Sequence, residues 1–263
     1  MRKYIFIFKT TFLESLQYTL NIILGFVSFF VVLFVFLNLW QYIYADSTNL
    51  ISGYSMEQMI WYVIITEIIF FGTRNRTLTG QMTSDIKSGT IAYNMNKPYN
   101  YIYYIVSRHL GEITLRFFLY LGIGILIGYH FVGGLAGFQA VNLILIVPVF
   151  LLGTLINSFL RMCISILSFW MEDAGPYHWI YDKIIIVVGT LFPVEMFPDW
   201  AQPLIKFSPI YVVTYGPAKL VIDFSMEMLW RVLLAQGIYL GITIIIITVM
   251  YQKGVKKLNV NGG

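Results

Sequence analysis

Charge is what this sequence has least of. Only 11% of its 263 residues are charged, 58% are hydrophobic, and the mean hydropathy is +0.75. Soluble domains carry about 25% charged residues. A chain so poor in charge cannot cover its whole surface for water, so we expect lipid around it. Uncharged runs at residues 15–45, 117–160 and 232–252 agree with this expectation. The composition predicts a polytopic membrane protein.

Residues for several other chemistries are also missing. Cys163 is the only cysteine, which excludes an intrachain disulfide. The histidines at 109, 130 and 178 show no metal-ligand spacing. The sequence contains neither a Walker A motif nor a nucleophile–base pair, and no basic patch is dense enough to follow phosphates. We therefore expect no catalytic residues, no metal, no cofactor held by this chain and no nucleic-acid partner.

The hydrophobic runs are typical of helices, because the alternation of a membrane β-strand is absent. The run 117–160 is too long for one crossing of about 20 residues, and the sequence GGLAG at 133–137 divides it. We expect an all-α protein forming a single transmembrane domain, 1–263, with six transmembrane helices. The predicted spans are 20–44, 56–73, 110–131, 140–168, 179–197 and 230–252.

The N-terminal segment, residues 2–18, does not have the composition of a span. Ile5, Phe8, Phe12 and Leu16 recur at helical spacing, with polar and charged residues on the other side. This pattern predicts an amphipathic helix lying in the membrane interface. A simple extension of the first span is the alternative.

Basic residues are distributed unevenly over the predicted loops. If both termini are cytoplasmic, all but three of the 17 Lys and Arg residues fall on the inner side; the exceptions are Lys206, Lys219 and Arg231. The positive-inside rule then predicts a multi-pass protein with both termini in the cytoplasm. We expect the membrane to be the cytoplasmic (inner) membrane of a prokaryote.

Two polar segments stand out within this layout. The sequence DIKSGTIAYNMNKPYNYIYY (85–104) lies between the second and third predicted spans and is followed by SRHLGE. The sequence GTLFPVEMFPDWAQPLIKFSPIYVVTYGP (189–217) closes the fifth. Together with the topology, these segments resemble the permease subunits of ABC-2-type exporters. Phe169 and Trp170 are similar to the branch associated with viologen and multidrug export.

The resemblance implies a coupling function for the cytoplasmic loop 78–104, which would dock on an ABC ATP-binding subunit. The implied docking residues are Asp85, Ile86, Lys87, Gly89, Thr90, Ile91 and Tyr93. Apolar and aromatic side chains on a loop are typical of protein contacts. The alternative for the tyrosines is an interfacial membrane belt, which we favour for Tyr99–Tyr104.

Ionisable residues within predicted spans are costly and therefore candidates for function. Glu67, Glu112, Arg116 and Arg161 are interpreted as a possible charge cluster at the inner leaflet that holds the second to fourth spans together. A proton or cation relay is the less favoured alternative, because arginine titrates poorly. Glu67 alone is a candidate for lining a pathway.

The segment 193–223 is predicted to form an outer re-entrant hairpin. It contains Pro193, Glu195, Pro198 and Pro209, which we interpret as an outer gate in which Glu195 caps exposed backbone.

The leading hypothesis is the permease subunit of an ATP-driven exporter for a hydrophobic or amphiphilic substrate (drug, lipid or peptide). Its partners would be two ATP-binding subunits, which hold ATP and Mg²⁺, and a second permease chain, identical or homologous. An ion-gradient-driven secondary transporter using Glu67 is the alternative, although its usual internal repeat is not evident. A third possibility, an intramembrane enzyme, lacks paired catalytic residues.

Overall fold

The computed structural model describes residues 2–17, 19–45, 50–74, 77–135 and 137–261. Predicted features at residue 18, which ends the proposed interfacial helix, and at Asp46 and Arg76 lie outside these ranges. The same holds for the side chains of residues 18–22 and 258–263.

Helices account for nearly all regular structure. In chain order the elements are α1 (Arg2–Ser15), α2 (Thr19–Tyr44), α3 (Met56–Thr73), the π-helix η1 (Thr77–Met82), α4 (Thr83–Lys87), α5 (Thr90–Met95), α6 (Tyr101–Phe131), the 3₁₀-helix η2 (Ala140–Asn142), α7 (Leu143–Ile166), the 3₁₀-helix η3 (Leu167–Phe169), α8 (Gly175–Ile184), the π-helix η4 (Ile185–Leu191), the 3₁₀-helix η5 (Val194–Met196), α9 (Gln202–Lys206), the π-helix η6 (Tyr211–Tyr215), α10 (Gly216–Ile222) and α11 (Met226–Asn261).

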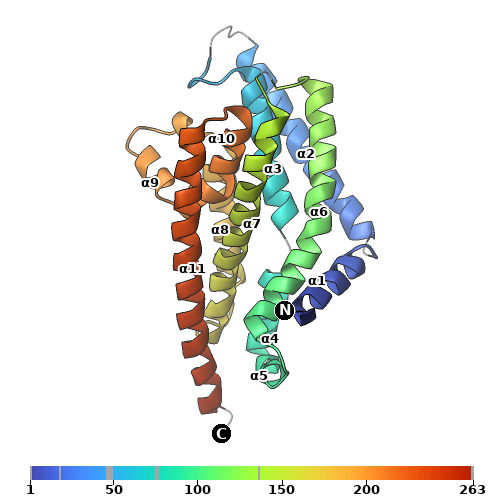
Figure 1. Ribbon diagram of the computed structural model, residues 1–263, viewed down its shortest axis with the longest axis vertical. Helices are drawn as coiled ribbons and strands as arrows, with labels where there is room; N and C mark the ends of the chain where they lie inside the picture. The colour runs from blue at the N-terminus through green and yellow to red at the C-terminus, as the bar shows by residue number, and fades with distance from the viewer. Residues whose placement is uncertain (1, 18, 46–49, 75–76, 136, 262–263) are drawn as a thin grey trace.

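The all-α polytopic class is confirmed. The structure is 83% helical with no strand among the described residues. Within these residues, five helical segments are long and apolar enough to cross a membrane: Ile23–Tyr44, Met56–Thr73, Tyr101–Phe131, Ala140–Phe169 and Met226–Lys257. They run roughly along the long axis of the molecule, and α4 and α5 lie at its lower end (Figure 1).

The segment predicted as the fifth span, 179–197, differs from these five. It begins within α8 and continues without interruption into η4, and the helical backbone ends where Phe192 turns extended. Pro193 follows directly; it has no N–H for a helical hydrogen bond, and its ψ of 153° is extended. This segment is shorter than the other crossings, so the sixth span stays a prediction.

The third predicted span, 110–131, is part of a longer helix. α6 begins at Tyr101, where the Asn100 side chain accepts a hydrogen bond from the backbone N–H of Tyr103 at 3.2 Å. Because this cap satisfies an otherwise orphaned donor, the helix starts within the polar loop. The last residues of the loop and the span therefore form one continuous helix.

Helix α3 is the centre of the bundle. Of its membrane-length window 78% is buried inside the chain, compared with 22% for α2, α6 and α11 and 33% for α7. A capping box between Ser55 and Gln58 begins it. A helix buried on all sides must be apolar on all sides, which α3 is apart from a few residues such as Glu67.

The N-terminal helix α1 packs beside α6 and is tilted against the long helices (Figure 1). Gly111 of α6 makes this packing close, because a Cβ atom there would lie 2.6 Å from the carbonyl oxygen of Phe8. Small residues let helix backbones approach in this way. α1 is thus attached to the lower end of the bundle through α6.

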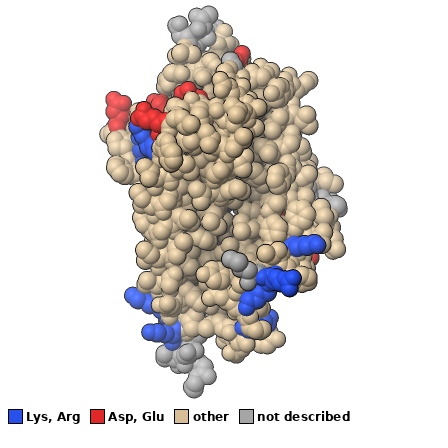
Figure 2. Space-filling model, in the orientation of Figure 1, with Lys and Arg blue, Asp and Glu red and all other residues tan. Residues whose placement is uncertain are grey.

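The two ends of the molecule differ in charge. On the face shown in Figure 2, Lys and Arg gather mainly toward the lower end, and Asp and Glu gather near the upper end. The coupling segment, which is the part of the loop 78–104 that contains α4 and α5, and the C-terminal end of α11 lie at the lower, basic end (Figure 1). The orientation of this end toward the cytoplasm stays a prediction.

Candidate functional site

The predicted coupling loop folds into a compact unit made of α4 and α5. Gly89 joins the two short helices with φ of +74°, a left-handed conformation that glycine adopts without strain. Ile86 and Ile91 are buried in a cluster with Leu78 and Met82. These apolar side chains hold the unit against the end of the bundle, so they support the loop rather than contact a partner.

Asp85 is also a supporting residue. Its carboxylate accepts a hydrogen bond from the Tyr101 hydroxyl at 2.8 Å and a longer one from the Asn94 amide at 3.4 Å. Tyr101 is 2% exposed and stacks on Tyr251 of α11, with ring centroids 6.3 Å apart. The hydrogen bond therefore ties α4 to the start of α6.

The remaining coupling residues form an exposed face. Lys87, Thr90 and Tyr93 are exposed, and Tyr93 keeps 67% of its surface accessible. Lys97 lies over the Tyr93 ring at 4.7 Å, and Met95 is exposed beside them. We call Lys87, Thr90, Tyr93 and Met95 the coupling face. The sequence also favours Met95 as a contact residue, because methionine on a polar loop is typical of protein contacts.

The tyrosines after Pro98 do not share one environment. Tyr99 stacks on Tyr104 with centroids 4.8 Å apart, and Tyr103 is 62% exposed with its ring edge-on to Tyr4 of α1. Tyr101, by contrast, is buried inside the chain. The expectation of a uniform membrane belt therefore does not describe Tyr101, whose neighbours α4 and α11 only the tertiary structure brings together.

Helix α1 is attached to the same segment. The Lys3 ammonium donates to the carbonyl of Pro98 at 2.5 Å, and the Tyr4 hydroxyl accepts the backbone N–H of Asn100 at 2.9 Å. Both bonds reach the turn before α6, so they connect α1 with the loop 78–104.

The four predicted inner charges do not form one cluster. Glu112 and Arg116 form an ion pair at 3.5 Å on α6, and the Thr77 hydroxyl donates to Glu112. Glu67 lies elsewhere, 2% exposed on α3, where it interacts with the Thr190 side chain. Arg161 has a different partner again, described next.

Arg161 pairs with Asp182 of α8 at 2.7 Å, a residue that sequence reasoning did not select. Its side chain is 2% exposed, and truncating one partner of such a buried pair is strongly destabilising. Next to it, Tyr181 donates to Asn157 at 2.8 Å, and Asn157 donates to Thr73 at 2.9 Å. This polar network connects α3, α7 and α8; nothing in the spacing of its members along the chain indicates it.

A polar cleft of about 560 Å³ opens beside this network. Its walls come from α2, α6 and α8, from the C-terminal end of α3, from η1 and from α7. Arg74, Arg116 and Arg161 line it together with Asp182. We call it the arginine cleft.

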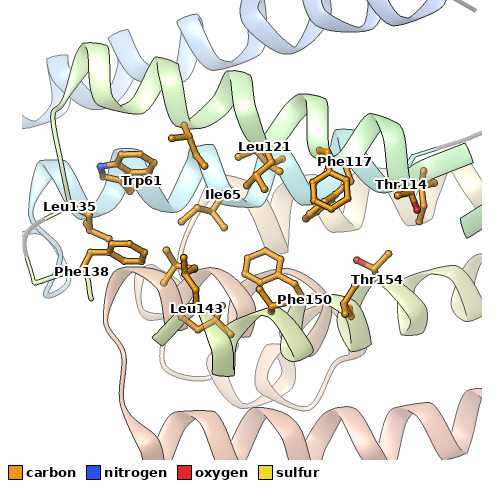
Figure 3. Close-up of a pocket in the computed structure, with 18 of the residues that line it drawn as sticks. Trp61, Ile65, Thr114, Phe117, Leu121, Leu135, Phe138, Leu143, Phe150 and Thr154 are labelled. Carbon is orange, nitrogen blue, oxygen red and sulfur yellow. The ribbon is translucent and has the colours of Figure 1, made fainter. Parts of the chain in front are cut away.

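An apolar cavity of about 450 Å³ lies between α3, α6 and α7. Figure 3 shows Trp61 and Ile65 of α3, Phe117 and Leu121 of α6 and Phe150 of α7 directed into it. Thr114 and Thr154 are at one end (Figure 3). A cavity with so few polar groups suits hydrocarbon.

At the opposite end of the molecule, Glu195 holds the outer hairpin together. Its carboxylate accepts hydrogen bonds from Tyr54, at 2.8 Å, and from Tyr215. Lys219 lies 4.4 Å from the centroid of the Tyr54 ring. Burial, and then the Glu195 charge, raises the pKa of Tyr54 above its usual value, so this hydroxyl keeps its proton at neutral pH.

The prolines of the hairpin bound its short helices. Pro193 precedes η5, Pro198 follows it, and Pro209 comes just before η6. The Tyr62 hydroxyl of α3 donates to the carbonyl of Gly189 at 3.0 Å. The Tyr62 hydrogen bond thus joins η4, which leads into the hairpin, to α3. The Glu195 contacts join the hairpin to the loop before α3.

A membrane-embedded helical bundle with a structured polar segment at its basic end, and cavities between its helices, has the architecture of a membrane transport subunit. Comparison with known families gives the particular family. Residues 27–262 match the model of the ABC-2 family transporter proteins. The chain belongs to this family and is a membrane permease of an ABC transporter, a class that associates with an ABC ATP-binding subunit. No curated protein matches the chain.

Proposed function

We propose that the chain is the permease subunit of an ATP-driven exporter that moves a hydrophobic or amphiphilic substrate, such as a drug, lipid or peptide, across a prokaryotic cytoplasmic membrane. Two ATP-binding subunits hydrolyse ATP, and a second permease chain, identical or homologous, completes the pathway. Both termini are cytoplasmic in this proposal. The viologen and multidrug branch is a further prediction, which rests on Phe169 and Trp170 alone.

The coupling face carries the proposal. Its exposed tyrosine, methionine and lysine are mounted on a framework of buried isoleucines and the Asp85–Tyr101 hydrogen bond. Tyrosine and methionine are enriched where proteins bind one another. An exposed contact surface on a rigid support is what transmission of force from an ATPase requires.

Three connections would carry that force into the membrane. On its N-terminal side, the coupling segment is connected through η1 to the end of α3. On its C-terminal side, it leads into α6. Lys87 also pairs with Asp173, at 3.5 Å, in the turn before α8. The Gly175 backbone N–H and then Lys87 lower the pKa of Asp173, so this carboxylate is charged at neutral pH. Closure of the ATPases would therefore displace α3, α6 and α8 together.

Co-purification tests the proposal. A tagged chain expressed with its candidate ATPase should retain that subunit, and transport should require ATP. Tyr93→Ala should weaken the association, because truncating a central aromatic contact costs about 2 kcal/mol or more. Tyr103→Ala, which removes an equally exposed tyrosine outside the coupling face, is the control. Retention of the ATPase by both variants alike would contradict docking at Tyr93.

The secondary transporter remains a second candidate because of Glu67. This carboxyl group is 2% exposed inside the bundle and makes no ion pair among the described residues, and buried membrane carboxyls are common in ion-coupled transport. Glu67→Gln keeps the shape of the side chain and removes its charge. Transport that persists without ATP and is abolished by Glu67→Gln or by collapse of the proton gradient would favour this alternative over the exporter.

A further inference from the structure

The arginine cleft has more hydrogen-bond donors than the protein uses. Each guanidinium offers five N–H groups. Arg161 donates to Asp182 through one terminal nitrogen, while its Nε has no partner in the described part of the chain. Arg116 donates to the carbonyl of Arg74 at 3.2 Å, and the Nε of Arg74 is 3.9 Å from Asp182. The three arginines therefore retain unused donors around one cleft.

The charge of the cleft is also unbalanced. Among the described residues that line it are three arginines and one carboxylate, Asp182. Glu112 does not line the cleft, but it forms an ion pair with Arg116 and so offsets part of the Arg116 charge. Buried polar atoms are normally satisfied, so the unpaired Nε–H of Arg161 in the wall of this cleft indicates a missing acceptor group.

The cleft is open at its rim and closed at its back. At the rim, the Arg74 side chain is 58% exposed and the Trp179 residue is 62% exposed. Arg161 and His178 at the back are 2% and 5% exposed. Phe26 is among the apolar residues that line the same space. A ligand with an anionic head and an apolar tail fits both kinds of wall.

The depth of the cleft in the membrane matches a lipid headgroup. The 18 residues of α3 extend about 27 Å at 1.5 Å per residue, close to the roughly 30 Å thickness of the hydrocarbon core. Arg74 follows the last residue of α3. It therefore lies near the boundary between hydrocarbon and headgroups, at the level of the phosphates of one leaflet.

We propose that the arginine cleft binds the phosphate headgroup of an amphiphile that enters laterally from the surrounding leaflet between α2 and α8. Arginine suits this ligand because its planar donor fork matches the oxygens of a phosphate. Arg74 and Arg116 contact the headgroup, Arg161 supplies positive charge from the back wall, and the apolar tail lies along Phe26 and Trp179. Nothing in the family match assigns such a site.

Fluorescence quenching by brominated lipids tests this binding. The full chain is reconstituted in phosphatidylcholine vesicles that contain brominated phosphatidic acid or, in a parallel arm, brominated phosphatidylcholine. The signal of Trp179 is obtained by subtracting the Trp179→Phe variant. We expect stronger quenching by phosphatidic acid than by phosphatidylcholine. The double variant Arg74→Gln/Arg116→Gln should lower the apparent affinity for phosphatidic acid about a hundredfold, because each lost charged contact lowers the affinity about tenfold.

Controls separate charge from folding. Arg108→Gln makes the same substitution on α6 outside the cleft and should leave quenching unchanged. Ser28→Phe narrows the mouth of the cleft from α2 without removing charge, and should also reduce binding. Circular dichroism checks that each variant is helical. If the double variant fails this check, Ser28→Phe decides the question.

Three outcomes would overturn the proposal. The first is equal quenching by both lipids, and the second is unchanged quenching in a folded double variant and in Ser28→Phe. The third is binding of inorganic phosphate to the chain in detergent, together with equal quenching by phosphatidic acid and phosphatidylcholine in vesicles. In that case the cleft binds a free anion and not an amphiphile. Retention of the ATPase is measured on the same preparations, so failure of lipid binding and failure of the exporter function are distinguished.

Discussion

Loss of one hydroxyl, in Tyr101→Phe, should loosen the coupling segment while leaving its packing intact. The Tyr101 hydroxyl donates to the Asp85 carboxylate at 2.8 Å, and the Tyr101 ring separately stacks on Tyr251. Phenylalanine keeps the ring and removes the donor. The variant therefore isolates the hydrogen bond that connects α4 with α6.

The expected magnitude follows from the environment of this bond. Hydrogen bonds to charged groups contribute about 1.5–3 kcal/mol. Asp85 is only half-buried and has a second, longer bond from Asn94, so we expect a value around the lower end of that range, about 1–2 kcal/mol. Such a loss raises the population of the detached α4 roughly five- to thirtyfold.

Hydrogen exchange of the α4 amides measures this change directly. ATPase activity of the assembled complex should become less dependent on substrate, because a loosened support transmits less movement. Tyr103→Phe is the matched control, since Tyr103 is exposed and its hydroxyl makes no hydrogen bond among those of the described residues. Equal exchange rates in the two variants would refute the supporting function of the Asp85–Tyr101 bond.

Three further substitutions test the packing of the bundle. Gly111→Ala should destabilise the attachment of α1 by about 1–3 kcal/mol through overpacking, whereas Gly122→Ala on the same helix, with open space around its Cβ, should not lower the melting temperature. Arg161→Gln should cost about 3–5 kcal/mol, because Asp182 would keep, among the described residues, only the exposed Arg74, 3.9 Å away, as a cationic partner. Arg231→Gln, in an exposed pair, should cost less than about 1 kcal/mol; similar melting temperatures would argue against a structural role for the buried pair. Tyr215→Phe should loosen the outer hairpin by about 1–2 kcal/mol, seen as faster hydrogen exchange there, and unchanged exchange would show that Tyr54 alone holds Glu195.

The class of the protein could be predicted from local sequence properties. Scarcity of charge and long apolar runs require a membrane, because hydrophobicity depends on composition and not on contacts. Five of the predicted spans correspond to helices of membrane length for the same reason. The break near Gly133 was also predictable, since it depends on local backbone preference.

The boundaries and the roles of individual residues were less accessible. Tyr101 belongs to α6 because of a cap at Asn100, and its burial depends on α4 and α11, which are distant in sequence. Within the predicted coupling residues, the sequence does not distinguish buried Ile86 and Ile91 from exposed Tyr93. Which face of a short helix is buried is determined by the elements that it meets.

The chain's own sequence thus determined that it lies in a membrane, that it is helical, and where its polar segment falls between the spans. Only the tertiary structure decided which charges meet. Arg161 pairs with Asp182 and not with the predicted acidic residues, and it shares a cleft with Arg74 and Arg116. The physical reason is range: hydropathy and capping act over a few residues, whereas ion pairs and clefts depend on packing between helices far apart along the chain.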